Sequence, residues 1–376
     1  MQNVKSLPQK LKEKKGFHLN MMIGFDGFVD EITHIVDKRI DHENYTRIPT
    51  IDKFGERMSN AAGLGTNVEF TPVYAKLGGN GPIMANALLE YGISLTYVGL
   101  LGKPSIQPVF EDMVEKLKAV YSLGEPGHTY ACEFEDGKIM VGKHAALREL
   151  TWESFKENLG GPESIAKIID ANFLTGIVNW TMLPHMSAIW EGIIREVFPL
   201  LTKRAQKPYV FFDLADPEKR TKEDILYAME LVGKFEEKFH AILGLNEKEA
   251  FDIAKLFGIE VSGDQEERLK AVAMGLYEKM GIYCLMVHPV RSACCVIDGE
   301  YYYTDGPYCP KPVLTTGAGD NFNAGFCLGL AIGLDPLSSL TLGVCTSGYY
   351  VRNAHSPTYD QVIEFAQKWA DGNVDD

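Results

Sequence analysis

Asp320 directly follows a turn of small residues in the stretch TTGAGDNFNAGF (315–326). Gly317, Ala318 and Gly319 allow the backbone to come close to a ligand. A helix predicted to begin near Asp320 would aim its free N–H groups and its positive dipole end at the same point, which is typical of an anion site. A carboxylate there can accept the proton of a hydroxyl that attacks a phosphoryl group. The pattern therefore fits phosphoryl transfer, but taken alone it fits Asp320 as a simple helix N-cap better.

The elements that must position this turn alternate between strands and helices after about residue 160. This alternation predicts βαβ units and a mostly parallel sheet. Asp-Gly pairs predict two hairpins, at 130–143 and 294–303. The predicted strands are 172–179, 209–214, 241–246 and 282–287, and the predicted helices are 188–201 and 223–239.

The first 150 residues follow another pattern. LNMMIGF (19–25) predicts a buried strand, and the stretch 40–76 is rich in turns and β-branched residues with little helical periodicity. With the hairpin at 130–143, these strands predict a small β-layer beside the main sheet. The pattern fits a lid and an ordinary extension of the sheet equally well.

Composition narrows the class of protein. The chain has 376 residues with 45% hydrophobic content, enough for one large α/β domain or two smaller ones. A net charge of −14 argues against general nucleic-acid binding. Seven cysteines without a CxxC pair argue against a disulfide framework or structural zinc, and favour a reducing compartment. With no signal peptide pattern and no apolar run long enough to span a bilayer, we expect a cytoplasmic protein that does not enter membranes.

Three motifs resemble those of the PfkB (ribokinase-like) carbohydrate kinases, in the family's order. TTGAGDNFNAGFCLGLAIGL (315–334) resembles the C-terminal signature, GGNGPIMANALLEYG (78–92) the glycine-pair motif, and GLNEKEA (244–250) the NxxE motif. GFDGFVDEI (24–32) and FFDLADPEKR (211–220) resemble two weaker segments, so the resemblance spans about residues 20–370. It implies an α/β fold, a doubly wound, mostly parallel sheet flanked by helices with a small β-sheet lid. We expect an N-terminal extension at 1–18 and a kinase domain at 19–376, with lid strands from about 40–76 and 128–145.

The resemblance also implies a role for each matching residue. Asp320 would be the catalytic base, and Gly317, Ala318 and Gly319 would form the anion hole. Asn246 and Glu249 would organise the magnesium and phosphates through water, which suits the tightly held water shell of Mg²⁺. The implied sugar-binding residues are Asp26, Asp30, Gly78, Gly79, Asn80 and Asn179. The implied nucleotide-binding residues are Asn246, Glu249, Arg291, Thr316 and Asn353.

The sequence departs from the family pattern at three places. Leu314 stands where an Asp usually anchors a monovalent cation, which puts potassium activation in doubt. Ile83 replaces an Asn of the glycine-pair motif and weakens an inference to ribose-like substrates. VHPVRSACC (287–295) replaces the usual Thr and glycines of the nucleotide loop, with His288 at the Thr position, so the phosphoryl donor preference stays open.

The resulting hypothesis is an ATP- and magnesium-dependent carbohydrate kinase that phosphorylates a hydroxyl of a small sugar or sugar-like compound. Two alternatives stay open: a nucleoside kinase of the same fold, and a non-catalytic sugar- or nucleotide-binding sensor. Exposed strand edges of a lid would also allow a homodimer.

Overall fold

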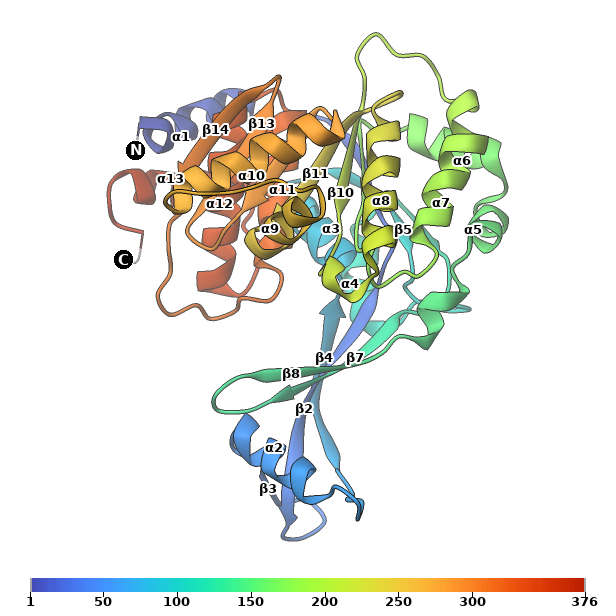
Figure 1. Cartoon of the computed structure of the whole chain (residues 1–376), viewed down its shortest axis with the longest axis vertical. Helices are drawn as coiled ribbons and strands as arrows, with labels where there is room; N and C mark the ends of the chain where they lie inside the picture. The colour runs from blue at the N-terminus through green and yellow to red at the C-terminus, as the bar shows by residue number, and fades with distance from the viewer. Residues whose placement is uncertain (1, 375–376) are drawn as a thin grey trace.

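The computed structural model describes residues 2–374 and contains a large sheet between two layers of helices (Figure 1). Every neighbouring pair of strands in this sheet is parallel, except the two pairs made by the strand at Ser292–Ile297. In the described part of the chain the sheet has nine strands, in the spatial order β14 (Glu300–Asp305), β13 (Ser292–Ile297), β12 (Cys284–His288), β11 (His240–Asn246), β10 (Tyr209–Asp213), β9 (Leu174–Ile177), β1 (Asn20–Gly24), β5 (Ser94–Gly99) and β6 (Ala119–Ser122).

The chain order changes direction between β1 and β9. β5 and β6 extend the sheet on one side of β1, whereas β9 to β14 extend it on the other. In open α/β sheets, ligands bind outside the carboxyl ends of the strands at such a switch point. The loops after β1 and β9 therefore lie where a site is expected.

Side chains alternate across the sheet and create two cores. Phe212 belongs to one core and its neighbour Phe211 to the other, because successive side chains of a strand point to opposite faces. The first face is covered by α5 (Trp152–Leu159), α6 (Pro162–Asp170), α7 (Met186–Gly192), α8 (Lys222–Phe235), α9 (Glu247–Leu256) and α10 (Gln265–Met280). The second is covered by α1 (Gln2–Lys14), α3 (Asn80–Glu90), α4 (Glu111–Glu115), α11 (Ala318–Ala331), α12 (Pro336–Asn353) and α13 (Tyr359–Ala370).

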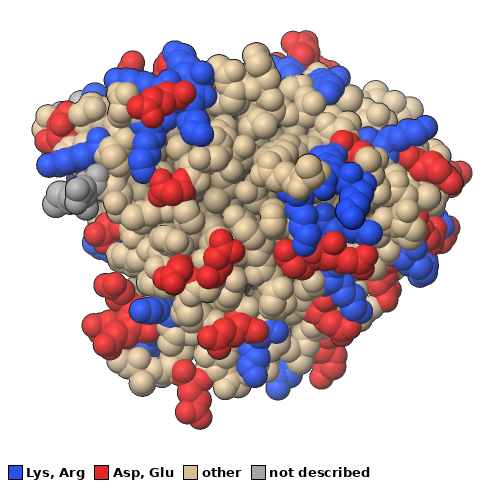
Figure 2. All heavy atoms as spheres, turned by 90° about the horizontal axis from the view of Figure 1, so that it is seen from above, with Lys and Arg blue, Asp and Glu red and all other residues tan. Residues whose placement is uncertain are grey.

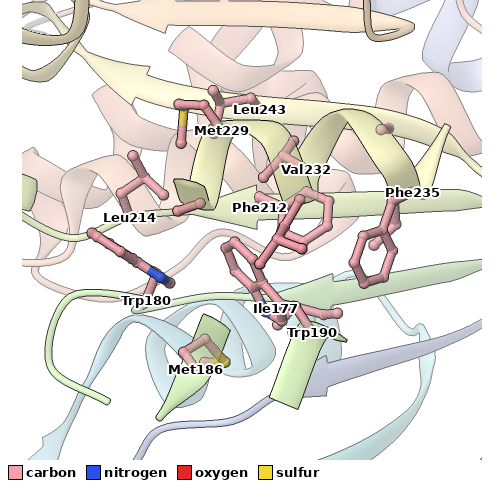
Figure 3. Close-up of a cluster of buried hydrophobic side chains, with 14 of the residues drawn as sticks. Ile177, Trp180, Met186, Trp190, Phe212, Leu214, Met229, Val232, Phe235 and Leu243 are labelled. Atoms are coloured by element: carbon pink, nitrogen blue, oxygen red, sulfur yellow. The ribbon is translucent and has the colours of Figure 1, made fainter. Parts of the chain in front are cut away.

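Aromatic packing joins α7 and α8 to the sheet, as Figure 3 shows. The Trp190 ring meets Phe212 edge to face at a centroid distance of 4.9 Å, and Phe235 of α8 meets the same Phe212 ring at 5.0 Å. Trp190 is completely buried. Truncation of such a residue to alanine typically costs about 3–5 kcal/mol, so this cluster is a main anchor of the helical layer.

A second sheet projects from the large one as a narrow arm, with a helix at its far end (Figure 1). Its central strand β2 continues the chain directly after β1 and pairs with three others. A small core centred on Cys132 and Phe134 lies between this sheet and α2 (Ile51–Asn60). The strands of this sheet, hereafter the lid, are β2 (Phe28–Arg39), β3 (Tyr45–Arg47), β4 (Phe70–Gly78), β7 (Gly127–Glu133) and β8 (Lys138–Lys143).

Most sequence-predicted elements are confirmed, and three predictions need correction. The four predicted strands after residue 160 correspond to β9, β10, β11 and β12, and both Asp-Gly hairpins form. The interpretation of 40–76 as non-helical is wrong, because it contains α2, and the first lid strand begins well ahead of residue 40. The predicted helix at 188–201 is instead three consecutive elements: α7, a π turn (Ile193–Val197) and a 3-10 turn (Phe198–Leu200). Elsewhere in the described chain, 3-10 turns occur at Pro108–Phe110, Ala145–Glu149 and Pro217–Lys219.

The N-terminal helix packs on the domain. Leu7 and Leu11 of α1 are fully buried, and the Tyr359 hydroxyl donates to the Leu11 carbonyl at 2.9 Å. Lys10 lies 2.7 Å from Asp335 at the start of α12. The residues predicted as an extension thus cover part of the second core.

The surface is mixed in charge. Figure 2 shows Lys and Arg side chains in separate groups between acidic ones on the upper face, without a continuous basic surface. Between residues 2 and 374, no helix combines the length and apolar character needed to cross a membrane.

Candidate active site

The turn before α11 requires glycine at Gly317. Gly317 is the N-cap of α11 and has a φ of +91°. A Cβ at this position would lie 2.9 Å from the Tyr350 hydroxyl oxygen and 3.0 Å from Ile83 Cγ2. Both the backbone conformation and the lack of space therefore select glycine, and the turn fixes where α11 begins.

Two backbone donors at the start of α11 are available to a ligand. The Ala318 N–H donates to the Thr315 carbonyl at 3.1 Å. The N–H groups of Gly319 and Asp320 donate to no other described residue. Since these groups lie at the positive end of the helix dipole, the turn can hold an anion.

Asp320 lies in the first turn of α11 and not at its cap. The helix begins at Ala318, two residues ahead of the predicted start, so the alternative that Asp320 only caps the helix is wrong. Asp320 Oδ1 accepts a hydrogen bond from Asn80 Nδ2 at 3.0 Å, while Oδ2 accepts none from the described residues. Asp320 is only 8% exposed. Burial, and then the nearby carboxylates of Asp213 and Asp26, raise the pKa of Asp320 well above its usual range.

One helical turn further along α11, the Asn323 side chain contacts a second buried carboxylate, that of Asp213 in β10. Asn323 Nδ2 donates to Asp213 Oδ2 at 2.9 Å, and Asn323 Oδ1 is buried without a hydrogen-bond partner among the described residues. Burial and the Glu249 carboxylate raise the pKa of Asp213 to about 8. Asp213, at the end of β10, therefore binds its proton far more tightly than an ordinary aspartate.

Asn246 and Glu249 form a reciprocal cap at the start of α9. Asn246 Oδ1 accepts from the Glu249 N–H, and Glu249 Oε2 accepts from the Asn246 N–H, both at 2.9 Å. Glu249 Oε1 accepts from the Asp216 N–H at 2.8 Å. This capping box fixes Glu249, and burial raises the pKa of its carboxyl group.

Asp26 lies in the loop after β1 and has no exposed surface. Its Oδ2 accepts from the Asn80 N–H at 2.9 Å and from Asn179 Nδ2 at 2.7 Å, and its Oδ1 accepts from the Gly81 N–H at 2.8 Å. Asn179, in the loop after β9, has a positive φ of 62°. Such a conformation is uncommon outside glycine and is typical of functional sites. The two loops at the switch point are thus joined through one carboxylate.

Asp30 approaches the same region from the lid. It lies opposite Lys76 of β4 and Thr129 of β7 in the strand register. A Cβ on Gly78 would lie 2.4 Å from the Asp30 carboxylate, and one on Gly79 would lie 2.7 Å from Asp26 Oδ2. The glycine pair therefore lies against both acids. Burial raises the pKa of Asp30, opposed mainly by the positive charge of Lys76.

A cavity of about 300 Å³ borders the α11 turn, which contributes Thr315, Ala318 and Gly319 to its wall. Asn246, the N-cap of α9, lines this cavity together with His288 and Phe322, whose rings lie 5.1 Å apart. Burial lowers the pKa of His288 to about 4, so the imidazole is neutral at neutral pH. The remaining lining residues are mostly apolar or small: Pro289, Val290, Ser292, Gly306, Pro307, Tyr308, Cys309, Pro312, Val344, Ser347, Gly348 and Val351.

Four of the five residues predicted at the nucleotide site do not line this cavity: Glu249 lies in the capping box at the start of α9, and the other three bind elsewhere. The Arg291 guanidinium stacks over Tyr308 at 3.7 Å, which places Arg291 beside one of the lining residues. The Thr316 carbonyl accepts from the Tyr350 hydroxyl, and Asn353 Nδ2 donates to the Tyr349 carbonyl on the exposed side of α12. Thr315 and Tyr308 line the cavity in their place.

Sequence reasoning gave no role to Asp213 and Asn323. Asp213 ends a buried strand next to the switch point, which is a signal for a ligand-side residue. Asn323 lies three residues after Asp320, so the two share a helix face. Both signals can be read from the sequence, but the hydrogen bond between Asp213 and Asn323 cannot.

Comparison with known proteins identifies the family. Residues 1–369 match the model of the family described as prokaryotic ketohexokinase. A ketohexokinase of Haloferax volcanii is 28% identical over 368 residues, which cover 97% of this chain and 94% of the relative.

Solved structures share the fold at lower identity. Ribokinase of Thermotoga maritima superposes with a TM-score of 0.62 at 16% identity, over 94% of this chain and all of that one. Ribokinase of Arabidopsis thaliana, solved with ribose and ATP, gives 0.61 at 16% identity, over 93% and 99% of the two chains. A phosphofructokinase-2 variant of Escherichia coli gives 0.63 at 14%, over 94% and 99%. The chain belongs to the prokaryotic ketohexokinase family, a group of carbohydrate kinases with the ribokinase fold.

Proposed function

We propose that this kinase transfers the γ-phosphoryl group of ATP to a hydroxyl of a ketohexose, with Asp320 as the base. One observation carries the proposal: Asp320 Oδ2 has no hydrogen-bond partner among the described residues, beside two unpaired backbone N–H groups. A proton acceptor and an anion site at one point are the two groups that phosphoryl transfer to a hydroxyl needs.

In the proposed reaction, the sugar hydroxyl gives its proton to Asp320 Oδ2 while its oxygen attacks the γ-phosphorus. The bond from that phosphorus to the bridging oxygen breaks, and ADP leaves with the electron pair. The N–H groups of Gly319 and Asp320 stabilise charge on the phosphoryl oxygens as it moves. Asn80 holds the other oxygen of the base through the 3.0 Å hydrogen bond and so orients the carboxylate.

We place the nucleotide in the 300 Å³ cavity, with its phosphates toward the α11 turn. We place the sugar at Asp30, Asn80 and Asn179, none of which lines the cavity, and these residues would hold sugar hydroxyls with Gly78 and Gly79. The sugar and the nucleotide would then meet at Asp320 from two directions, as in-line transfer needs.

The acidic residues between the two sites fit a magnesium ion held through water. The orphaned Asn323 Oδ1 and the carboxylates of Asp213 and Glu249 are hard oxygen donors, which Mg²⁺ prefers. No three His, Cys, Asp or Glu side chains within residues 2–374 are close enough to bind a metal ion directly. When bound with the nucleotide, magnesium would neutralise phosphate charge. Asn246 and Glu249 would orient its water ligands.

The Asp320→Asn variant tests the base. An amide cannot accept the proton, so we expect kcat for ketohexose phosphorylation to fall by about 100-fold or more. ADP release measured with a coupled assay gives the rate, and thermal shifts with sugar and ATP report binding. Asp298→Asn in the exposed β13–β14 turn is the matched control and should keep full activity. Full activity of Asp320→Asn would rule out the mechanism, and sugar binding without turnover in the unmodified protein would indicate a sensor.

We also propose that potassium does not activate the enzyme. Leu314 is half-buried, and its side chain offers no oxygen where relatives carry a cation-anchoring Asp. Replacing KCl by choline chloride at equal ionic strength should leave kcat unchanged. A several-fold loss of rate in choline would contradict this.

A homodimer through the lid is a further part of the proposal. β4 and β8 are the two edges of the sheet around β2, and four large apolar side chains on them are exposed: Val73, Tyr74, Met140 and Val141. Unpaired edges with apolar side chains invite pairing. Sedimentation velocity should show a dimer, and Tyr74→Glu combined with Met140→Glu should shift it to monomer.

With all seven cysteines free, we place this protein in the reducing cytoplasm.

A further inference from the structure

Asp26 is a fully buried carboxylate that the proposed reaction does not consume. It accepts three hydrogen bonds of 2.7–2.9 Å, two from backbone N–H groups and one from the Asn179 side chain. Its backbone carbonyl accepts a fourth from the Tyr97 hydroxyl at 2.8 Å. A carboxylate that is enclosed and this well bonded has little capacity left for a sugar hydroxyl.

The two backbone donors belong to the first residues of α3, Asn80 and Gly81. The N-cap of this helix is Gly79, which has no side chain to accept from the free N–H groups. Asp26, from a different part of the sheet, supplies that acceptor and places negative charge at the positive end of the helix. A Cβ on Gly79 or Gly81 would lie within 2.7 Å of an Asp26 oxygen, so glycine at both positions permits this contact.

Asn80 links Asp26 to the proposed base: its backbone binds Asp26, and its side chain binds Asp320. The Asn80 N–H donates to Asp26, and Asn80 Nδ2 donates to Asp320 Oδ1. Moving the start of α3 would therefore move the amide that orients Asp320. The bond to Asn179 links the loop after β9 to this chain of contacts.

We propose that Asp26 is a positioning residue, which caps α3 from the end of β1 and holds the Asn80 amide on Asp320. This assignment replaces a direct role in sugar binding, and it rests on the proposed function of Asp320 as base. Asp30 accepts no hydrogen bond from α3. It remains the candidate for sugar binding from the lid.

The Asp26→Asn variant separates the two roles. It keeps the size of the side chain but places an amide NH₂ against donors, so α3 should shift. We expect kcat to fall by roughly 10- to 100-fold, as misplacement of a catalytic group by about 1 Å can cost, while the KM for the sugar changes little. Asp30→Asn removes the same charge and should instead raise the KM for the sugar with a smaller effect on kcat. A raised KM with unchanged kcat in Asp26→Asn would overturn the proposal.

A double-mutant cycle with Asn80→Ala tests the route through Asn80. This change removes the side-chain contacts of Asn80, to Asp320 and to the proposed sugar, and keeps its contact to Asp26, because Asp26 binds the Asn80 backbone. If Asp26 acts through that amide, the double variant should be no slower than Asn80→Ala alone, since coupled residues are not additive. Losses in kcat that multiply would show that Asp26 acts by another route.

Two measurements do not depend on turnover. In a crystal structure of Asp26→Asn, the separation between Asn80 Nδ2 and Asp320 Oδ1 should exceed hydrogen-bond distance, and the N–H groups of Asn80 and Gly81 should exchange faster with deuterium. An unchanged separation and unchanged exchange would overturn the positioning role. If no sugar is phosphorylated by the unmodified protein, the proposed function fails, and these two measurements still decide whether Asp26 positions Asn80.

Discussion

At the residue scale, the site contains several carboxylates whose environments differ. Asp26 receives three hydrogen bonds, and burial nevertheless raises its pKa to about 6. Asp213 receives one from Asn323 and has a pKa of about 8. Burial therefore raises the pKa of Asp213 further than that of Asp26, which is offset by more hydrogen bonds. Carboxylates whose environments push their pKa values apart indicate a division of roles, which fits positioning by Asp26 and proton binding near Asp320.

The Asp213→Asn variant should shift the pH dependence of the reaction. Below the pKa of Asp320 the base is protonated, so kcat/KM falls as the pH decreases through that value. Asp213, Asp26 and Glu249 all raise the pKa of Asp320 by repulsion. Removing the Asp213 carboxylate lowers the pKa of Asp320, so the acidic decline should move to lower pH. Asp298→Asn should leave the profile in place, and a profile that moves to higher pH in Asp213→Asn would contradict the assignment.

Sequence reasoning found the groups that occur in motifs and missed those defined by pairing. Asp320, Asn80 and Asp26 lie in the predicted stretches and come together in the fold. Asp213 was not assigned a role, because its partner Asn323 is 110 positions away and no local pattern links the two. Asn353 was predicted at the nucleotide site, but its side chain bonds to its own helix.

At the element scale, the site depends on where helices begin. α3, α9 and α11 all start at the carboxyl edge of the sheet, and each start is fixed by a different device. Gly317 provides a positive φ for α11, the Asn246–Glu249 capping box fixes α9, and Asp26 caps α3 from outside. Glycine turns and caps are local in sequence, so the first two were predictable, whereas the third requires the fold.

The Gly317→Ala variant should damage the start of α11. Alanine at a φ of +91° costs about 1–2 kcal/mol of strain, and its Cβ would also meet Tyr350 and Ile83 at 2.9–3.0 Å. The turn must shift, so we expect kcat to fall at least 10-fold along with a lower melting temperature. Gly333→Ala, at the other end of α11, imposes a similar strain at a φ of +74° without a close contact to the site. It should lower the melting temperature and leave kcat intact, and an equal loss of kcat in both variants would show a general effect of stability.

The lid shows why one helix escaped prediction. α2 has no fully buried residue, and it carries Gly55 in its interior and Ser59 and Asn60 at its end, which weaken a helical pattern. It forms because Ile51 and Phe54 pack on the lid core around Cys132 and Phe134. That core joins strands distant in sequence, so tertiary packing decides the conformation of a segment whose local signal is weak.

At the scale of the whole molecule, the carboxyl edge of one sheet collects every part of the proposed reaction. β1 and β9 lead to Asp26 and Asn179, on the side that we assign to the sugar. β11 and β12 lead to Asn246 and His288, on the side that we assign to the nucleotide. The lid strand β2 continues the chain after β1, so the lid joins the domain on the side that we assign to the sugar and projects from it as an arm (Figure 1). This separation means that the two substrates can be perturbed independently.

The Ser347→Trp variant tests that separation. Ser347 of α12 lines the 300 Å³ cavity and is half-buried, so an indole in its place would occupy space that we assign to the nucleotide. Filling the cavity should raise the KM for ATP at least 10-fold while stabilisation of the protein by sugar in a thermal shift experiment stays unchanged. Asp30→Asn should give the reverse pattern, with weaker stabilisation by sugar and an unchanged KM for ATP. If Ser347→Trp instead weakened sugar binding and left the KM for ATP unchanged, our assignment would be reversed. The sugar would then bind in the cavity, and the nucleotide would bind on the side of Asp30.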